Sequence, residues 1–202
     1  MSIDSKSPRK RVLIIQGHPD SSQSHFCHAL ADAYSSGADV AGHEVRRIDI
    51  ARLDFRLLGS KDEWENGAVP PSLAEPQRAI AWADHIVIFF PLWLGSMPAL
   101  VKGFFEQTLR PGFAFEKGAS GKRWATGLSG KTARVVVTMG MPALLFRLYF
   151  CSHGVRSFER NVLEFCGIRP VLTSMIGMVE AHAGARRRKW LKVMWAHGER
   201  AR

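Results

Sequence analysis

A cluster of hydroxyl side chains and histidines follows the first apolar run of the chain. The segment GHPDSSQS at 17–24 leads into a sequence typical of a helix, for which we expect Ser24 to be the N-cap. Free N–H groups at a helix start, hydroxyls and the helix dipole together suit a phosphate. The segment contains neither GxGxxG nor GxxxxGK[ST], so it matches neither the dinucleotide fingerprint nor the P-loop. It predicts an anion site, or else an ordinary turn capped by Ser24.

Two later segments have compositions that suit contact with a flat ring. The turn PLWLGSMP at 91–98 is aromatic and apolar, and its backbone groups could reach the polar edge of a ring. Alternatively, the turn fills part of the hydrophobic core or contacts a second subunit. Thr138, Met139 and Gly140 offer a hydroxyl, a flexible thioether and a position that permits close backbone approach. Together with the anion site, these segments predict a ring that carries a phosphate tail.

The elements that must position these segments are strands alternating with helices. Apolar runs predict strands at 11–16, 44–50, 85–90, 133–138 and 171–178, and amphipathic patterns predict helices at 24–41, 74–83, 98–109, 154–166 and 184–202. Segments 51–72 and 110–132 are rich in turn formers and are expected to be irregular. Five strands with crossover helices predict an α/β fold with a doubly wound parallel sheet covered on both faces. Ligands of such sheets bind beyond the carboxyl ends of the strands, where all three segments lie.

Length and charge restrict the class of protein. A chain of 202 residues suits a single domain, with its core at about 11–178. The net charge of +10 is concentrated at the two ends, since 1–11 holds four basic and one acidic residue and 186–202 holds seven and one. The intervening residues, 12–185, are nearly neutral, which argues against a basic groove for nucleic acid. No nucleic-acid partner is therefore expected. The basic segment at 186–189 is expected to be solvated and remote from the ring site.

Cell location and redox state follow from what the sequence lacks. No apolar stretch reaches the roughly 20 residues of a membrane-spanning helix, and no signal-peptide core follows the first basic residues. We therefore expect a cytoplasmic protein. The three cysteines form no CxxC pair and are expected to be reduced thiols.

The chain resembles the flavodoxin-like NAD(P)H:quinone oxidoreductases, which include quinone reductases, bacterial drug-activity modulators and the flavoprotein ancillary subunits of potassium efflux systems. The matching stretches are RVLIIQGHPDSSQSHF at 11–26, ADHIVIFFPLWLGSMPALVKGFFEQTL at 83–109, VVVTMG at 135–140 and LEFCGI at 163–168. The resemblance implies a flavin, FMN or FAD. Its expected contacts are His18, Ser24, His25 and Phe26 at the phosphate end, and Pro91, Leu92, Trp93, Leu94, Gly95, Thr138, Met139 and Gly140 at the ring.

The resemblance also implies an activity. A hydride passes from NAD(P)H to the flavin and then to a quinone or similar acceptor by ping-pong turnover, usually in a homodimer, and the efflux type implies a membrane-protein partner. His153 resembles a histidine that stabilises reduced flavin or acceptor, although its spacing to 165–167 is shorter than in the family. Leu94 and Gly95 replace a second aromatic residue of the family, and Val137-Thr138-Met139-Gly140 replaces Thr-Thr-Gly-Gly.

Two other functions compete with this interpretation. His18-Pro19-Asp20 resembles the start of the His-Pro-Asp-Asp-Glu motif of zinc-dependent deacetylases, but Ser21 and Ser22 replace the acidic residues that follow. His25 and His28 lack a third ligand, so no metal site is expected. The second alternative is a flavin-binding regulatory or electron-carrier subunit. Electron-carrying flavodoxins are strongly acidic, so the neutral body favours direct turnover of pyridine nucleotide.

Overall fold

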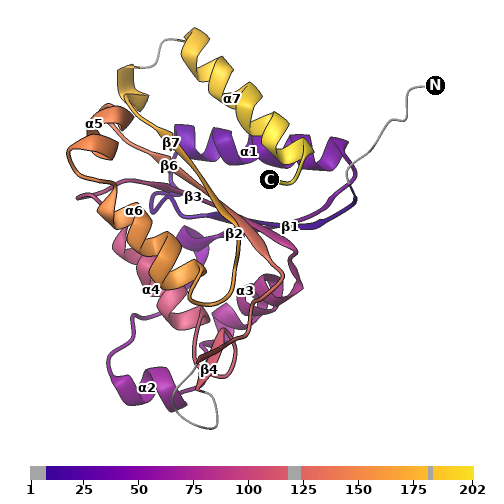
Figure 1. The fold of residues 1–202 in the computed structure, drawn as a ribbon, viewed down its shortest axis with the longest axis vertical. Coiled ribbons are helices and arrows are strands. Elements are labelled where there is room, and N and C mark those ends of the chain that lie inside the picture. Colours follow the sequence, from indigo (N-terminus) through magenta and orange to yellow (C-terminus); the bar gives the residue numbers. More distant parts are fainter. Residues whose placement is uncertain (1–7, 118–123, 182–183) are drawn as a thin grey trace.

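A five-stranded parallel sheet forms the centre of the structure, which is a computed structural model that describes residues 8–117, 124–181 and 184–202 (Figure 1). Its strands are β1 (Arg11–Gln16), β2 (Glu44–Asp49), β3 (His85–Pro91), β6 (Thr132–Thr138) and β7 (Val171–Ile176). They lie in the order β2-β1-β3-β6-β7, and every neighbouring pair is parallel. The expected doubly wound sheet is confirmed, and its strand order reverses beside β1, where such folds bind ligands.

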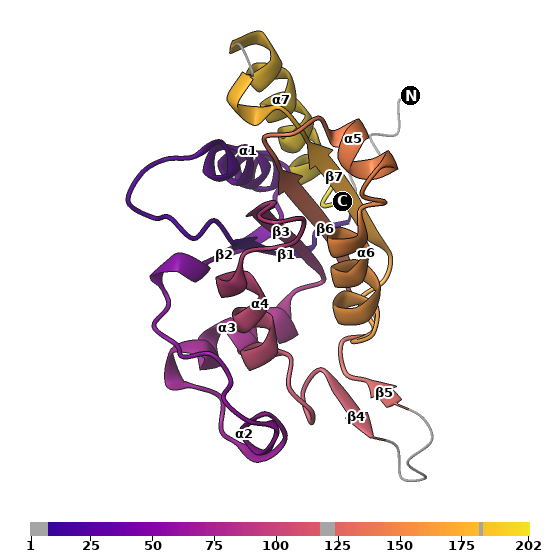
Figure 2. The ribbon, with the colours of Figure 1, turned by 90° about the vertical axis from the view of Figure 1, so that its left-hand side faces the viewer.

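Helices cover both faces of the sheet, as Figures 1 and 2 show. One face carries α1 (Phe26–Val40) and α7 (Gly184–Glu199), and the other carries α3 (Pro71–Trp82), α4 (Ala99–Thr108) and α6 (His153–Phe158), which a π turn extends over Glu159–Leu163. The apolar strands are buried on both sides because successive side chains point to opposite faces. In β1, Val12 and Ile14 pack under α1, whereas Leu13 and Ile15 join the core under α3 and α4.

The C-terminal helix packs on the sheet through the face that its sequence predicts. Met194 is fully buried, and Trp190 and Leu191 are packed against the same cluster as α1. Two glycines permit this contact: a Cβ on Gly37 of α1 would lie 2.0 Å from the Trp195 carbonyl oxygen, and one on Gly198 would lie 2.0 Å from that of Tyr34. Glycine is therefore required on both helices for this close crossing.

Several short elements lie where irregular chain was expected. The segment after β2 contains a 3₁₀ turn (Ile50–Arg52) and α2 (Lys61–Asn66), where Ser60 Oγ accepts from Glu63 N at 3.1 Å. The segment after α4 contains an antiparallel hairpin of β4 (Phe115–Lys117) and β5 (Trp124–Thr126), and part of the expected irregular segment, 118–123, lies outside the described residues. A further helix, α5 (Ala143–Leu148), precedes α6. Elements of three to six residues are too short to show a clear period in the sequence.

Within the described residues, no helix combines the length and the apolar character that crossing a membrane requires.

Candidate functional site

Three loops meet at the carboxyl edge of the sheet and enclose a pocket of about 330 Å³, which we call the strand-end pocket. The residues that line it are His18, His25, Phe26, Cys27, Pro91, Leu92, Trp93, Thr138, Met139, Gly140, Val179, Glu180 and Arg187. Nine of the twelve residues expected at a cofactor site are thus brought together, by the loops that follow β1, β3 and β6.

The loop after β1 is held by the buried Gln16 beneath it and by Asp20 within it. Gln16 Oε1 accepts from His18 N at 2.9 Å, and Gln16 Nε2 donates to the Cys27 carbonyl oxygen at 3.2 Å, so one amide links both ends of the loop. Asp20 Oδ1 accepts from Ser22 N at 2.8 Å, and Asp20 Oδ2 lies 2.7 Å from His25 Nε2. Hydrogen bonds from Ser22 and His25 hold the pKa of Asp20 well below its usual range. This carboxylate therefore fixes the loop conformation.

Three imidazoles stack at the base of this loop. The rings of His18 and His25 lie 3.8 Å apart at 16°, and His28 lies 5.3 Å from His18. Burial, followed by the neighbouring histidines, lowers the pKa of His18, and burial is also the main cause of the lowered pKa of His28. Two of the rings are therefore biased toward their neutral form. In the part of the chain that the structure describes, no group of His, Cys, Asp or Glu side chains is arranged to hold a metal ion.

The start of α1 differs from the expectation. The helix begins at Phe26, and its N-cap is His25, whose N–H donates to His28 Nδ1 at 3.2 Å. The expected N-cap role of Ser24 is therefore wrong. Ser24 is exposed and lines a neighbouring polar pocket instead of the strand-end pocket. An imidazole three residues into the helix can satisfy the N-cap N–H as a carboxylate does in a capping box, which accounts for the shift.

The turn after β3 forms an apolar side of the pocket and projects beyond it. Trp93 and Ser96 close the turn with two backbone hydrogen bonds, of 2.9 and 3.0 Å. Leu94 and Gly95 at its tip have φ of 46° and 79°, a left-handed conformation that favours glycine. Leu94 is wholly exposed, and neither it nor Gly95 lines the pocket. The flat apolar side therefore consists of Pro91, Leu92 and Trp93.

The loop after β6 supplies the opposite, open side. Thr138 is paired with Pro91 across the sheet, and its carbonyl oxygen accepts from Leu92 N at 2.7 Å, which fixes the two loops relative to each other. A Cβ on Gly140 would meet only Glu180 Oε1, at 3.7 Å. The backbone there is consequently approachable from the pocket.

His153 lies outside the strand-end pocket. It is exposed at the first turn of α6, and its N–H donates to the Phe150 carbonyl oxygen at 3.2 Å. The next residue is tightly packed against the turn after β3, because a Cβ on Gly154 would lie 2.1 Å from the Gly95 carbonyl oxygen. His153 is thus next to a residue that touches the projecting turn.

Arg187 corrects the expectation that the basic segment is remote from this site. It lines the strand-end pocket, with its guanidinium 5.3 Å from the centre of the Phe26 ring. Val179 and Glu180, after β7, were also missed. A sequence signal was available, because a helix that follows a strand of a parallel sheet starts at the carboxyl edge. Both α1 and α7 follow such strands, and this brings their first turns together.

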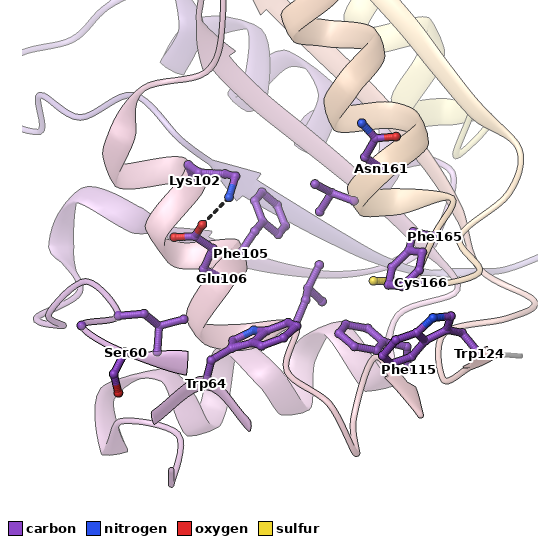
Figure 3. A pocket seen from close by; sticks show the side chains of 14 residues that line it. Ser60, Trp64, Lys102, Phe105, Glu106, Phe115, Trp124, Asn161, Phe165 and Cys166 are labelled. Atoms are coloured by element: carbon purple, nitrogen blue, oxygen red, sulfur yellow. Dashed lines mark hydrogen bonds and ion pairs between the residues drawn. The ribbon is translucent and has the colours of Figure 1, made fainter. Parts of the chain in front are cut away.

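A larger aromatic groove, of about 620 Å³, shares no lining residue with the strand-end pocket. Figure 3 shows Lys102 and Phe105 of α4 facing Asn161 and Phe165 across it, with an ion pair between Lys102 and Glu106 at one side. Its floor holds Trp64, Phe115 and Trp124, and the Phe115 ring lies 5.5 Å from Trp124 and 5.0 Å from Phe165. We call this the aromatic groove.

Comparison with known proteins agrees with the resemblance found in the sequence. The chain is 28% identical over 169 residues to an uncharacterized NAD(P)H oxidoreductase of Haemophilus influenzae, with 82% of each chain covered. It is 30% identical over 211 residues to the ribosyldihydronicotinamide dehydrogenase [quinone] of Mus musculus, covering 93% of this chain and 89% of that one. An NAD(P)H:quinone oxidoreductase from Methanothermobacter marburgensis has the same fold, with a TM-score of 0.83, 23% identity, and 96% and 100% of the two chains covered. A family model described as flavodoxin-like fold matches residues 10–194, so this chain belongs to that family.

Proposed function

We propose that this chain is a flavin-dependent NAD(P)H oxidoreductase that reduces quinones or similar acceptors by ping-pong hydride transfer. One observation carries the proposal: the loops after β1, β3 and β6 form a single pocket with a flat apolar side and an end lined by the imidazoles of His18 and His25 and by Arg187. The relatives named as oxidoreductases support it, and they favour it over the deacetylase and carrier alternatives. A bound flavin would accept the hydride and pass it on, which is the chemistry that the cofactor itself supplies.

The residues of the pocket fit the two ends of a flavin. At the phosphate end, His18 Nδ1 accepts from Asp20 N at 3.2 Å, so the Nε2–H of this ring and the guanidinium of Arg187 are the donors offered to an anion, and the rings of His25 and Phe26 line that end. At the ring, Pro91, Leu92 and Trp93 would exclude water from one face, while Thr138, Met139 and Gly140 offer backbone groups to the polar edge. Ser24 is assigned no direct phosphate contact, because it faces the neighbouring pocket.

The projecting turn and His153 would act at the acceptor side. Leu94 and Gly95 extend beyond the pocket rim and could cover a flat molecule placed on the ring. His153 directly precedes Gly154, which packs on this turn, and it could donate a proton to the acceptor. The proton is needed because reduction of a quinone by a hydride leaves an oxygen anion.

A second copy of the chain is the proposed occupant of the aromatic groove. Trp124 is 51% exposed and Phe165 is 37% exposed, and contiguous apolar patches of this kind commonly mark protein interfaces. Sedimentation of the purified chain should give a dimer, and Trp124→Ser should weaken it. A membrane-protein partner and a location in the cytoplasm stay predictions from the sequence.

The direct test is spectroscopic and kinetic. Purified protein should show the visible absorption of a flavin, identified by mass spectrometry after release, and should oxidise NAD(P)H in the presence of a soluble quinone. Folded protein that binds neither FMN nor FAD would refute the proposal. Flavin binding without any NAD(P)H-dependent turnover would instead support the carrier or regulatory alternative.

A further inference from the structure

A group of large hydrophobic side chains is exposed on α5 and just after it. We call this group, with exposed fractions from 43% to 76%, the apolar ridge; it consists of Leu144, Leu145, Leu148, Tyr149 and Phe150. Single exposed hydrophobic residues are common on protein surfaces and need no explanation. A contiguous group of this kind marks contact with another surface.

The core holds α5 so that the apolar ridge faces outward. Phe146 is almost completely buried in the core cluster that also contains residues of α6. Leu144 and Leu148 lie two positions before and after Phe146, so both are on the opposite side of the helix. The ring of Phe150 lies 6.2 Å from that of Phe146 and 4.9 Å from that of Tyr149. The burial of Phe146 therefore fixes the direction in which the two leucines project.

Cations without acidic neighbours in the sequence lie beside the apolar ridge. The segment 139–158 contains Arg147 and Arg156 and no acidic residue. Both side chains are exposed, and neither has an ion-pair partner in the part of the chain that the structure describes. Arg147 lines a hollow of about 380 Å³ together with Leu144 of α5 and Met175 of β7. A positive charge thus stands next to the exposed leucines.

The start of α7 adds positive charge at the same end of the molecule. The chain after β7 packs against the start of α5, since Met178 N donates to the Met141 carbonyl oxygen at 3.1 Å, and it then continues into α7. Apart from Arg187, the exposed basic residues in the first two turns of α7 are Arg186, Arg188 and Lys189. Glu180 is the one acidic residue of the segment 177–189, so this end has a positive net charge.

A second copy of the chain suits this end of the molecule poorly. None of the residues of the apolar ridge lines the aromatic groove, which is the proposed contact between copies. Figures 1 and 2 show α5 at the end of the molecule away from α2 and β4, which border that groove. Two copies that met through the apolar ridge would bring like charges together, at a cost in binding free energy. A negatively charged surface is instead attracted by the same residues.

We propose that the apolar ridge and the basic start of α7 dock this protein on the surface of an anionic lipid bilayer. The leucines and the two aromatic rings enter the boundary between headgroups and acyl chains, while the arginines and Lys189 remain with the lipid phosphates. Such docking is peripheral and requires no membrane-spanning helix. It is independent of the proposed function, because no bound flavin takes part in it.

Docking has a consequence for the acceptor, and this consequence rests on the proposed function. His153 and Gly154 follow the apolar ridge closely in the sequence, and Gly154 packs on the projecting turn that exposes Leu94. The acceptor side of the strand-end pocket therefore faces the bilayer when the apolar ridge is inserted. The acceptor class is then a quinone dissolved in the membrane.

Vesicle flotation of the full chain tests the docking. The native protein should float with vesicles made of equal parts phosphatidylcholine and phosphatidylglycerol, and much less with phosphatidylcholine alone or at high salt. The double variant with Leu144→Ser and Leu148→Ser should bind about a hundredfold more weakly, because two buried leucines are lost. Arg147→Gln should bind about fivefold more weakly.

Two variants remote from the apolar ridge are the controls. Val40→Ser changes a side chain that is 70% exposed at the end of α1, and Arg78→Gln changes an exposed cation on α3. Both should float as the native protein does. The docking is overturned if the native protein does not float with the anionic vesicles, or if the double leucine variant floats equally well. Should that variant not fold, Arg147→Gln decides alone.

Sedimentation without lipid tests the second copy as the occupant. If the double leucine variant is a monomer where the native protein is a dimer, another copy covers the apolar ridge and the inference is overturned. An unchanged assembly in the double variant, together with lost flotation, supports the bilayer.

Turnover separates the docking from the proposed function. NAD(P)H oxidation is measured with a soluble quinone and with a quinone whose long isoprenoid tail holds it in the anionic vesicles. The double leucine variant should lose most turnover of the vesicle quinone and keep that of the soluble one. Equal turnover of the vesicle quinone by native and variant protein overturns the membrane acceptor. Protein that floats but oxidises no NAD(P)H with either quinone supports the docking and refutes the proposed function.

Discussion

The guanidinium of Arg187 lies 5.3 Å from the centre of the Phe26 ring, and it joins the first turn of the last helix to the first turn of α1. This contact places a fixed positive charge at one end of the strand-end pocket. The basic residues beside it in the sequence, Arg186 and Arg188, do not line that pocket. Successive residues of a helix point in different directions, so only Arg187 of this basic segment faces the strand-end pocket.

Replacing Arg187 by Gln should weaken flavin binding by about two- to fivefold, the loss expected for an exposed cation over an aromatic ring. Isothermal titration with FMN and FAD measures the effect. Arg186→Gln and Arg188→Gln are matched controls that should bind as the native protein does. Equal losses in all three variants would mean that general charge, and not the contact with Phe26, attracts the flavin.

Flavin binding should be accompanied by proton uptake. Burial lowers the pKa of His18 and His28 from the ordinary 6.5 in the free protein. A phosphate dianion close to these rings favours their charged form and raises the pKa again. Affinity should therefore increase as pH falls from about 8 to 6.5, where imidazole begins to bind protons. Titration in two buffers of different ionisation enthalpy counts the protons, and His28→Gln should reduce the number. Zero uptake in the native protein contradicts the prediction.

Acid should unfold the protein through two histidines, the buried His85 and the partly buried His197. Burial lowers the pKa of His85 to about 3 and that of His197 to about 4. In the unfolded chain these histidines bind protons near pH 6.5. The free energy of unfolding is therefore highest above that pH, and it decreases as the pH falls toward the pKa values of the folded state. His85, which is buried, can contribute a slope of up to about 1.4 kcal/mol per pH unit, and the partly exposed His197 contributes less.

Urea unfolding at pH 7 and pH 5 measures this acid effect. His85→Gln should lower stability at pH 7 but reduce the loss between the two pH values. His153→Gln, at an exposed position, is the control and should leave the slope unchanged. An identical slope in native protein and His85→Gln would show that other groups cause the acid sensitivity.

The α1–α7 crossing should be intolerant of any side chain. In Gly37→Ala the new Cβ meets backbone atoms of Trp195, so the two helices must separate, at a cost of about 1–3 kcal/mol. Thermal unfolding measures this cost, and flavin affinity should fall as well because Arg187 moves with α7. The control is Gly59→Ala, whose Cβ has only Glu63 Oε2 nearby, at 3.7 Å. Lower stability with unchanged flavin affinity would show that α7 positions no part of the site.

The strands could be predicted from the sequence because buried parallel strands are continuous apolar runs. His85–Pro91 is such a run, and its predicted bounds were off by a single residue. The β4–β5 hairpin could not be predicted in this way, because its strands have three residues each and their pairing depends on the fold. The pocket loops were found because parallel topology gathers strand ends at one edge. Topology places the first turn of α7 at this edge, but which of its side chains enters the pocket depends on how α7 packs on α1, so Arg187 was missed. The predicted N-cap role of Ser24 was wrong because His28 accepts from the N–H of His25, which becomes the cap.

The strand-end pocket depends on α7, which is synthesised after the loops that form the rest of the pocket. A ribosome produces the loops after β1, β3 and β6 first, but α7 is the final element along the described chain and packs on α1, one of the earliest. Contacts between such distant segments form slowly, because a long stretch of chain must be closed before they can stabilise anything. A nascent chain that ends before residue 184 has the three loops but lacks the end of the pocket that Arg187 lines. The strand-end pocket is therefore complete only after α7 has been synthesised and has packed on α1.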